Sequence, residues 1–200
     1  RKKIATYAVT PDYRPRVFAF LRRQVREGRQ CYIICPMIDE GRDDTASVES
    51  YAAKLKSAWL PSCRIGMLHG RMKPREKEAV MAAFAEDGLD VLVSTTVVEV
   101  GVDVPNAAVM LIENAERYGL SQLHQLRGRI GRGNEAATCI LISDAKNDEA
   151  VSRLKILCST SDGFRIADED LRLRGPGDFF GQRQHGLPEL KIASMSEDMT

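Results

Sequence analysis

The residues best suited to chemistry are Arg129 and Arg132, in the glycine-rich stretch QLRGRIGRG of residues 125–133. We expect these two arginines, three positions apart, to lie on one face of a single helical turn. A guanidinium group is permanently charged and can bind two phosphate oxygens at once. Without side chains, glycines let a phosphate or a facing backbone come close. The stretch holds three of them, Gly128, Gly131 and Gly133. It predicts a phosphate-binding site; the alternative is a solvated basic helix end capped by glycine.

The sequence lacks the other half of a nucleotide site. The pattern GxxxxGK[ST], which cradles phosphates after a strand, does not occur. The stretch GRIGRG has the glycine spacing of a dinucleotide fingerprint reversed, so it is not a Rossmann signature. Phosphate-facing arginines without a phosphate cradle are typical of groups that act in trans on a nucleotide held by another domain. We therefore expect the chain, which does not begin with Met, to be a piece of a longer protein.

Short apolar runs alternate with helical patterns along the first 145 residues. The runs that predict buried strands are 31–35, 64–68, 90–94, 107–112 and 138–142. The helical patterns lie at 14–27, 47–59 and 74–86. This alternation predicts an α/β domain with a mostly parallel sheet and helices on both faces. Ligands gather at the carboxyl ends of such strands, which here lead into 69–73, 94–103 and 113–119.

The alternation ends near residue 145, so we divide the chain into 1–145 and 146–200. Helices are predicted at 146–160 and 167–173, before a loop rich in glycine and proline at 174–188. A loop of this length is usually either functional or disordered. Its adjacent Phe179 and Phe180 argue against plain disorder. They could anchor the loop to the domain or, alternatively, stack on DNA bases.

The composition fits one domain, alone or with an appendage, whose formal net charge is only +1. Any nucleic-acid binding must therefore come from local patches, such as the nine Lys and Arg within residues 1–30. Five cysteines without a CxxC pair, and three scattered histidines, indicate neither a disulfide framework nor a zinc site. No apolar run reaches membrane-spanning length, and no signal peptide opens the chain. We expect a cytoplasmic protein with reduced thiols.

Three motifs resemble, in order and spacing, those of the second RecA-like domain of superfamily 2 helicases. They are LHGRMKPREKEAVMAAF (68–84), VLVSTTVVEVGVDVPNA (91–107) and QLHQLRGRIGRG (122–133). The segment DGFRIADEDLRLRGPGDFFGQRQHGLPE (162–189) resembles the translocation motif of the RecG family of bacterial DNA helicases. The resemblance covers essentially the whole chain. It implies a RecA-like fold of the P-loop NTPase type, followed by a helical hairpin and a translocation loop.

The resemblance also implies roles at the nucleotide. Arg129 and Arg132 match the arginine fingers of the family, and Gln125 is the first residue of that motif. Asp103 resembles the residue that reaches toward the ribose or the finger, and Gly101 lets the backbone pass closely. The nucleotide would be ATP with Mg²⁺, bound mainly by a first RecA-like domain that this chain lacks. No metal ligand is expected in the chain itself.

DNA contacts are implied in two segments that follow strands. Ser94, Thr95 and Thr96 resemble residues that hydrogen-bond a DNA phosphate. The threonines alone are more typical of ordinary strand-end residues, but the EVGVDVP that follows them favours the phosphate contact. The group His69, Gly70 and Arg71 precedes a helix N-terminus, a position that suits a backbone phosphate. His69 alone is more typical of a structural histidine.

Three residues match the family's translocation positions, namely Arg174, Arg183 and Gln184. The resemblance implies a motor half that remodels replication forks and branched DNA in recombination and repair, and that is inactive as an ATPase alone. Its implied partners are branched DNA and the wedge and first RecA-like domains of the same chain. We expect a monomer in the bacterial cytoplasm, associated with the nucleoid and not with a membrane. The alternatives are a transcription-repair coupling factor motor, a non-catalytic interaction module and half of an RNA helicase.

Overall fold

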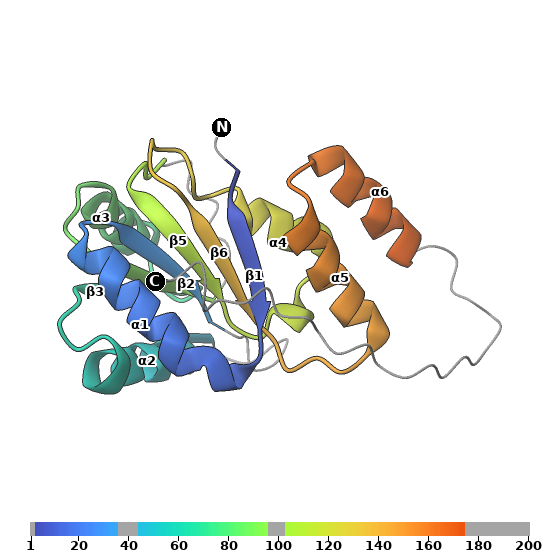
Figure 1. Ribbon diagram of the computed structural model, residues 1–200. Coiled ribbons are helices and arrows are strands. Elements are labelled where there is room, and N and C mark those ends of the chain that lie inside the picture. Colours follow the sequence, from blue (N-terminus) through green and yellow to red (C-terminus); the bar gives the residue numbers. More distant parts are fainter. Residues whose placement is uncertain (1–2, 36–43, 96–102, 175–200) are drawn as a thin grey trace.

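The computed structural model describes residues 3–35, 44–95 and 103–174. Six strands form one sheet, in which all neighbouring strands are parallel, with the order β1-β6-β5-β2-β4-β3 (Figure 1). The strands are β1 (Ala5–Val9), β2 (Gln30–Ile34), β3 (Ile65–Leu68), β4 (Val91–Ser94), β5 (Ala107–Ile112) and β6 (Thr138–Ile142). The predicted α/β fold with a parallel sheet is confirmed.

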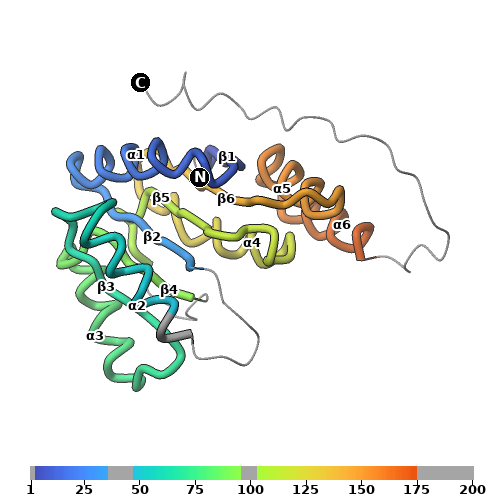
Figure 2. The backbone as a smooth tube through the Cα atoms, turned by 90° about the horizontal axis from the view of Figure 1, so that it is seen from below, coloured from blue at the N-terminus to red at the C-terminus, as the bar shows by residue number. Residues whose placement is uncertain are grey.

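Helices cover both faces of this sheet. They are α1 (Arg14–Arg26), α2 (Asp44–Lys54), α3 (Pro74–Ala85), α4 (Leu120–Arg127), α5 (Asp148–Ser159) and α6 (Gly163–Arg174). Helices α1 and α2 lie on one face, while α3, α4 and α5 lie on the other, with α6 packed against α4 and α5 (Figure 2). The layering follows from the strands, which are apolar on both sides and must be covered twice.

The central strand β2 shows how two cores arise from one sheet. Cys31 and Ile33 point into the core beneath α1 and α2, whereas Tyr32 and Ile34 point toward α3 and α4. This alternation is the normal two-residue period of a strand. All five cysteines are free thiols: Cys31, Cys35 and Cys139 are buried, and Cys63 and Cys158 are half-buried. The buried sulfurs pack as small apolar side chains do.

Several element boundaries differ from the expectations. Strand β1 was not predicted, because an edge strand of partly exposed residues has no continuous apolar run. Helix α4 was also not predicted, because its eight residues give only a short periodic pattern. The predicted helix 47–59 is α2 followed by a π-helical turn at Leu55–Trp59, in which Leu60 N–H donates to Leu55 O at 2.6 Å. Helix α6 begins at Gly163, four residues earlier than predicted.

Candidate nucleotide and DNA site

The part of the arginine–glycine stretch that holds Arg129 and Arg132, residues 128–133, follows α4 and is not one helical turn, so the predicted helical conformation of these two arginines is wrong. Helix α4 ends at Arg127, and the Arg129 N–H donates to Leu126 O at 3.0 Å in a closing turn. Gly131 then adopts a φ of +74°, which ends helical geometry and is accessible to glycine without strain. Ile130, only 1% exposed, anchors the turn in the core between the two arginines.

A charged cluster forms around the second arginine. Arg132 Nη1 lies 2.5 Å from Asp103 Oδ1, and the two side chains are 32% and 62% exposed. The charges of Arg129 and Asp103 both act on the pKa of the Tyr32 phenol, so both residues lie near this ring. Burial raises the pKa of Tyr32 to about 12, and the charges of Arg129 and Arg132 oppose this rise. The structure therefore gathers Arg129, Arg132 and Asp103 over the α3 and α4 side of the sheet, partly open to solvent.

The glycines in this stretch have separate steric roles. A Cβ on Gly133 would lie 2.5 Å from the carbonyl oxygen of Pro105, so a facing backbone approaches this glycine closely. A Cβ on Gly131 would lie 3.2 Å from Ile4 Cγ1, in addition to the strain of its positive φ. Gly133 thus holds the arginine turn against the segment that carries Asp103. Of the two partners expected to approach these glycines, a phosphate or a facing backbone, the structure thus shows the backbone at Gly133.

The second predicted group lies at the carboxyl ends of β3 and β4. These strands are paired, with Leu68 opposite Ser94, so His69 and Thr95 follow neighbouring strand ends. Gly70 and Arg71 are exposed, and His69 is half-buried. The turn is closed by Met72 N–H, which donates to His69 O at 3.3 Å. The structure therefore juxtaposes the two predicted DNA-contacting segments, as expected for ligand positions in a parallel sheet.

Burial distinguishes the members of this group. Ser94 is 4% exposed and Thr95 is 0% exposed. The buried Thr95 Oγ1 has no hydrogen-bond partner among the residues that the structure describes. A buried hydroxyl without a partner is costly, so a ligand or a local rearrangement that supplies one would be favourable. A direct phosphate contact by Thr95 would require this hydroxyl to become uncovered.

The N-terminus of α3 next to Arg71 already has a carboxylate. Lys73 N–H donates to Glu76 Oε2 at 2.7 Å, across the first turn of the helix. A negative side chain here stabilises the helix dipole and occupies part of the position that a phosphate would take. Gln125, a candidate for the nucleotide side, is exposed and lies on α4. Thr96, Gly101, Arg183 and Gln184 lie outside the described residues, and their roles stay predictions.

Sequence reasoning missed a polar cluster at the end of β5. Glu113 is 1% exposed and accepts hydrogen bonds from Arg14 Nε at 3.0 Å and Arg14 Nη2 at 2.6 Å. Tyr51 Oη also donates to Glu113 Oε1 at 3.0 Å. The cluster joins β5 to α1 and α2 at the edge where the candidate DNA segments lie. The available signal was a glutamate directly after an apolar strand, where a charge needs a partner.

The predicted translocation residue Arg174 ends α6. Its Nη2 lies 3.2 Å from Asp170 Oδ2, and Ser121 Oγ of α4 donates to the same carboxylate oxygen at 2.8 Å. Arg127, 3% exposed, donates to the carbonyls of Leu157 at 2.5 Å and Thr160 at 2.8 Å. Helix α4, which leads into the arginine turn, is thus bonded to both helices α5 and α6.

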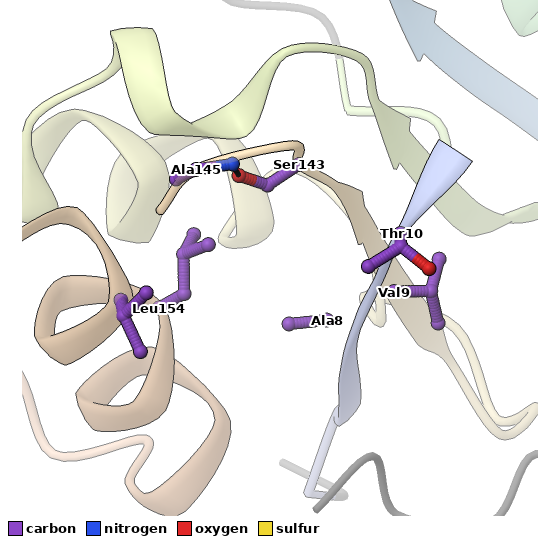
Figure 3. A pocket seen from close by; sticks show the side chains of 7 residues that line it. Ala8, Val9, Thr10, Ser143, Ala145 and Leu154 are labelled. Atoms are coloured by element: carbon purple, nitrogen blue, oxygen red, sulfur yellow. Dashed lines mark hydrogen bonds between the residues drawn. The ribbon is translucent and has the colours of Figure 1, made fainter. Parts of the chain in front are cut away.

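A small pocket lies between the sheet edge and α5 (Figure 3). Its lining is formed by Ala8, Val9, Thr10, Ser143, Ala145, Val151 and Leu154. Its size and its mostly apolar lining do not suit a nucleotide. Across the described ranges, there is no cluster of three acidic, histidine or cysteine side chains that could hold a metal. The helices within those ranges are all too short or too polar to cross a bilayer.

Together, the fold and the arginine turn define the chain as a RecA-like α/β domain of the helicase type. The chain belongs to the family of the helicase conserved C-terminal domain, whose profile matches residues 16–134. A second profile, described as ATP-dependent DNA helicase RecG, domain 3, C-terminal, matches residues 160–200. The family resemblance predicted from the motifs is therefore confirmed.

Similar proteins extend this match to almost every residue. The chain is 52% identical to the ATP-dependent DNA helicase RecG of Synechocystis, over 99% of this chain and 24% of the relative. It is 47% identical to RecG of Bacillus subtilis, over 99% of this chain and 29% of the relative. A solved structure of RecG bound to a three-way DNA junction is 46% identical, with a TM-score of 0.75 over 88% of this chain and 23% of that chain. The chain thus spans less than a third of the length of these relatives.

Proposed function

We propose that this chain is the C-terminal motor half of an ATP-dependent DNA helicase that remodels replication forks and other branched DNA. The rest of the motor, a first RecA-like domain and a wedge domain, would belong to the same polypeptide. The protein would act as a monomer in the bacterial cytoplasm, at the nucleoid. Residues 1–145 would form the RecA-like domain, and residues 146–200 would form the helical hairpin and translocation loop.

The observation that carries this proposal is the arginine turn in a chain of this family. Arg129 and Arg132 gather beside Asp103 on a partly open surface, while the sequence has no phosphate cradle of its own. This combination suits groups that complete a nucleotide pocket from the opposite side. The whole-chain similarity to RecG, including a RecG structure bound to a three-way junction, supports branched DNA as the substrate.

ATP would lie between this domain and the first RecA-like domain. Arg132 would exchange Asp103 for the γ-phosphate as the domains close, and Arg129 would approach the same charge. Mg²⁺ would be held by the first RecA-like domain, together with the β-phosphate. Gln125 and Gly101 would contribute to the nucleotide side of the cleft.

DNA would be held through its backbone at the ends of β3 and β4. His69, Gly70 and Arg71 would contact one phosphate, and residues 94–96 would contact the next. Phosphate contacts carry no sequence information, so binding should depend on DNA shape and on salt. Arg174, Arg183 and Gln184 would convert the nucleotide cycle into movement along duplex DNA.

The test is Arg132→Ala in the full-length protein. DNA-stimulated ATP turnover should fall by about 10³-fold or more, the size of effect known for arginine fingers. Binding of a three-way junction without nucleotide should stay within about twofold of wild type, because the finger faces the nucleotide and not the DNA. The matched control is Arg172→Ala, which removes an exposed arginine of α6 whose ion pairs lie within its own helix. Its turnover should equal that of the wild type.

Turnover of the Arg132→Ala protein near the wild-type value would overturn the finger assignment. Loss of turnover together with loss of junction binding would point to misfolding, which the melting temperature of the variant would reveal. A transcription-repair coupling factor is the rival motor, but the match of residues 160–200 favours the RecG type. A non-catalytic module would show no ATP turnover in either protein.

A further inference from the structure

Tyr32 is a polar side chain of the central strand that the proposed function does not use. It is half-buried in the middle of β2 and packs against the core on the α3 and α4 side of the sheet. Its ring meets the ring of Phe84 on α3 edge to face, with the ring centres 4.9 Å apart and the planes at 71°. Such a pair prefers a defined geometry, so this contact holds the Tyr32 ring at one place on the sheet.

The same core anchors the two segments that carry the charged cluster. Val104, which follows Asp103, is 2% exposed, and Ile130, which follows Arg129, is 1% exposed. Both are members of the core cluster against which Tyr32 packs. The charges of Asp103 and of both arginines of the turn act on the phenol. The hydroxyl of Tyr32 therefore lies among the groups that the proposed function places at the nucleotide.

Packing alone does not explain this hydroxyl, because phenylalanine would fill the same apolar space. Within the described residues, the Tyr32 hydroxyl forms no hydrogen bond, although a tyrosine hydroxyl near a core usually has a partner. A phenol can donate one hydrogen bond. Of the three charged groups that act on it, only the Asp103 carboxylate can accept, because a guanidinium group has no acceptor atom. Asp103 is thus the partner that the chemistry of this cluster offers.

Asp103 has a partner in this structure and would lose it in the proposed cycle. Arg132 Nη1 lies 2.5 Å from Asp103 Oδ1, and the Asp103 side chain is 62% exposed, so water reaches it as well. When the two RecA-like domains close, Arg132 would leave for the γ-phosphate and the cleft would exclude water. A carboxylate that loses both its cation and its water is costly. A donor that then reaches Asp103 would favour the closed state.

We propose that Tyr32 is a positioning residue of the arginine-finger site, whose hydroxyl donates a hydrogen bond to the Asp103 carboxylate when Arg132 leaves it for the γ-phosphate. This inference rests on the proposed function, since the exchange by Arg132 is part of it. The hydrogen bond holds Asp103 in place and lowers the free energy of the closed state relative to the open state. Tyr32 does not touch ATP and acts through Asp103.

The experiment compares the full-length protein with its Tyr32→Phe variant, both bound to a three-way junction. The substitution removes one oxygen atom and keeps the ring against Phe84. The ligands are MgADP alone and MgADP with beryllium fluoride, which stands in for the γ-phosphate. The Kd with beryllium fluoride should rise at least about tenfold, the effect expected for a lost hydrogen bond to a charged group. The Kd for MgADP alone should stay within about twofold of wild type, because only the γ-phosphate draws Arg132 from Asp103.

A double-mutant cycle with Asp103→Ala tests the partner. If the hydroxyl acts through Asp103, Tyr32→Phe should change the Kd with beryllium fluoride by less than about twofold once Asp103 is alanine. A direct contact between the hydroxyl and the nucleotide would persist without Asp103 and would overturn the assignment. The matched control is Tyr13→Phe, which removes the hydroxyl of a half-buried tyrosine that packs against the core on the other face of the sheet. Its Kd values for both ligands should equal those of the wild type.

The inference is overturned if Tyr32→Phe leaves the Kd with beryllium fluoride unchanged, or if it weakens both ligands equally. Equal weakening with a lowered melting temperature would make Tyr32 a structural core residue only. The proposed function fails separately, because wild-type turnover in Arg132→Ala would mean that no exchange at Asp103 takes place. Lost turnover in Arg132→Ala beside unchanged ligand binding in Tyr32→Phe refutes this inference alone.

Discussion

The arginine turn depends on glycine more than on helix geometry. The two arginines were expected on one helical face, yet a turn with a positive φ at Gly131 places them around Ile130. The spacing of the arginines could not reveal this conformation, because a separation of three residues is compatible with either a helix or a turn. The glycines did indicate that another group approaches this stretch closely, and in the structure the Pro105 carbonyl oxygen lies against Gly133.

Gly133→Ala should therefore destabilise the protein. The added Cβ would lie 2.5 Å from the Pro105 oxygen, and backbone atoms cannot move aside as a flexible side chain can. Overpacking of this kind costs about 1–3 kcal/mol. Urea unfolding followed by the fluorescence of Trp59, the single tryptophan, measures it. Gly70→Ala is the control, since a Cβ at that position would meet no atom within 4 Å. Equal midpoints for the two variants would contradict the steric argument.

Among the elements, α4 is the one that connects the site to the rest of the domain. It leads into the arginine turn, and its Arg127 binds the carbonyls at the end of α5. One turn earlier, His124 Nδ1 lies 3.2 Å from Arg127 Nη2, and a Cβ on Gly163 of α6 would lie 3.3 Å from His124 Nε2. A positive charge on His124 would therefore face Arg127 at the joint between three helices.

Protonation of His124 should loosen this joint. Burial, and then the charge of Arg127, lower the pKa of His124 below its ordinary value near 6.5. The folded state thus binds fewer protons here than the unfolded state. The resulting stability is fully present above about pH 6.5 and is lost as the pH falls through the folded pKa.

The measurement is urea unfolding between about pH 7.5 and pH 5, a range that spans the ordinary histidine pKa. The wild type should lose stability more steeply over this range than His124→Gln, which cannot titrate at this position. Parallel pH profiles for the two proteins would show that the histidine does not contribute.

The same elements show what could be predicted from the sequence. Five strands and the helices α1, α2, α3, α5 and α6 were identified, α2 and α6 with shifted bounds, because buried parallel strands are continuous apolar runs and helices carry apolar stripes. The positions of His69 and Thr95 at neighbouring strand ends followed from the parallel sheet. Strand β1 and the cluster of Arg14, Tyr51 and Glu113 could not be found, since both depend on partners far away in the sequence, 62 residues for Tyr51 and 99 for Arg14.

For the molecule as a whole, the proposed function makes this chain one wall of a nucleotide pocket. It would supply the arginines, and a first RecA-like domain would supply the phosphate cradle and Mg²⁺. ATP hydrolysis should then require both domains, since an arginine finger from one domain stabilises charge on a phosphate that the other domain positions.

The 200-residue chain by itself should accordingly hydrolyse ATP no faster than buffer, with or without junction DNA. A coupled assay of ATP turnover on the purified chain tests this, with the full-length protein as the positive control. Circular dichroism should show a mixed helix and strand spectrum, which establishes that the inactive chain is folded. Turnover by the chain that the Arg132→Ala substitution abolishes would place a complete site within it.

The free cysteines have a practical consequence. Burial raises the pKa of Cys139 to about 12 and of Cys158 to about 11, and it raises the pKa of Cys31, Cys35 and Cys63 as well. Thiolate is the reactive form, so all five native sulfurs should react slowly with maleimides at neutral pH. A cysteine introduced on the exposed face of α1 or α6 should be labelled first, which makes the domain suitable for fluorophore attachment and for testing, one molecule at a time, the proposed movement along DNA.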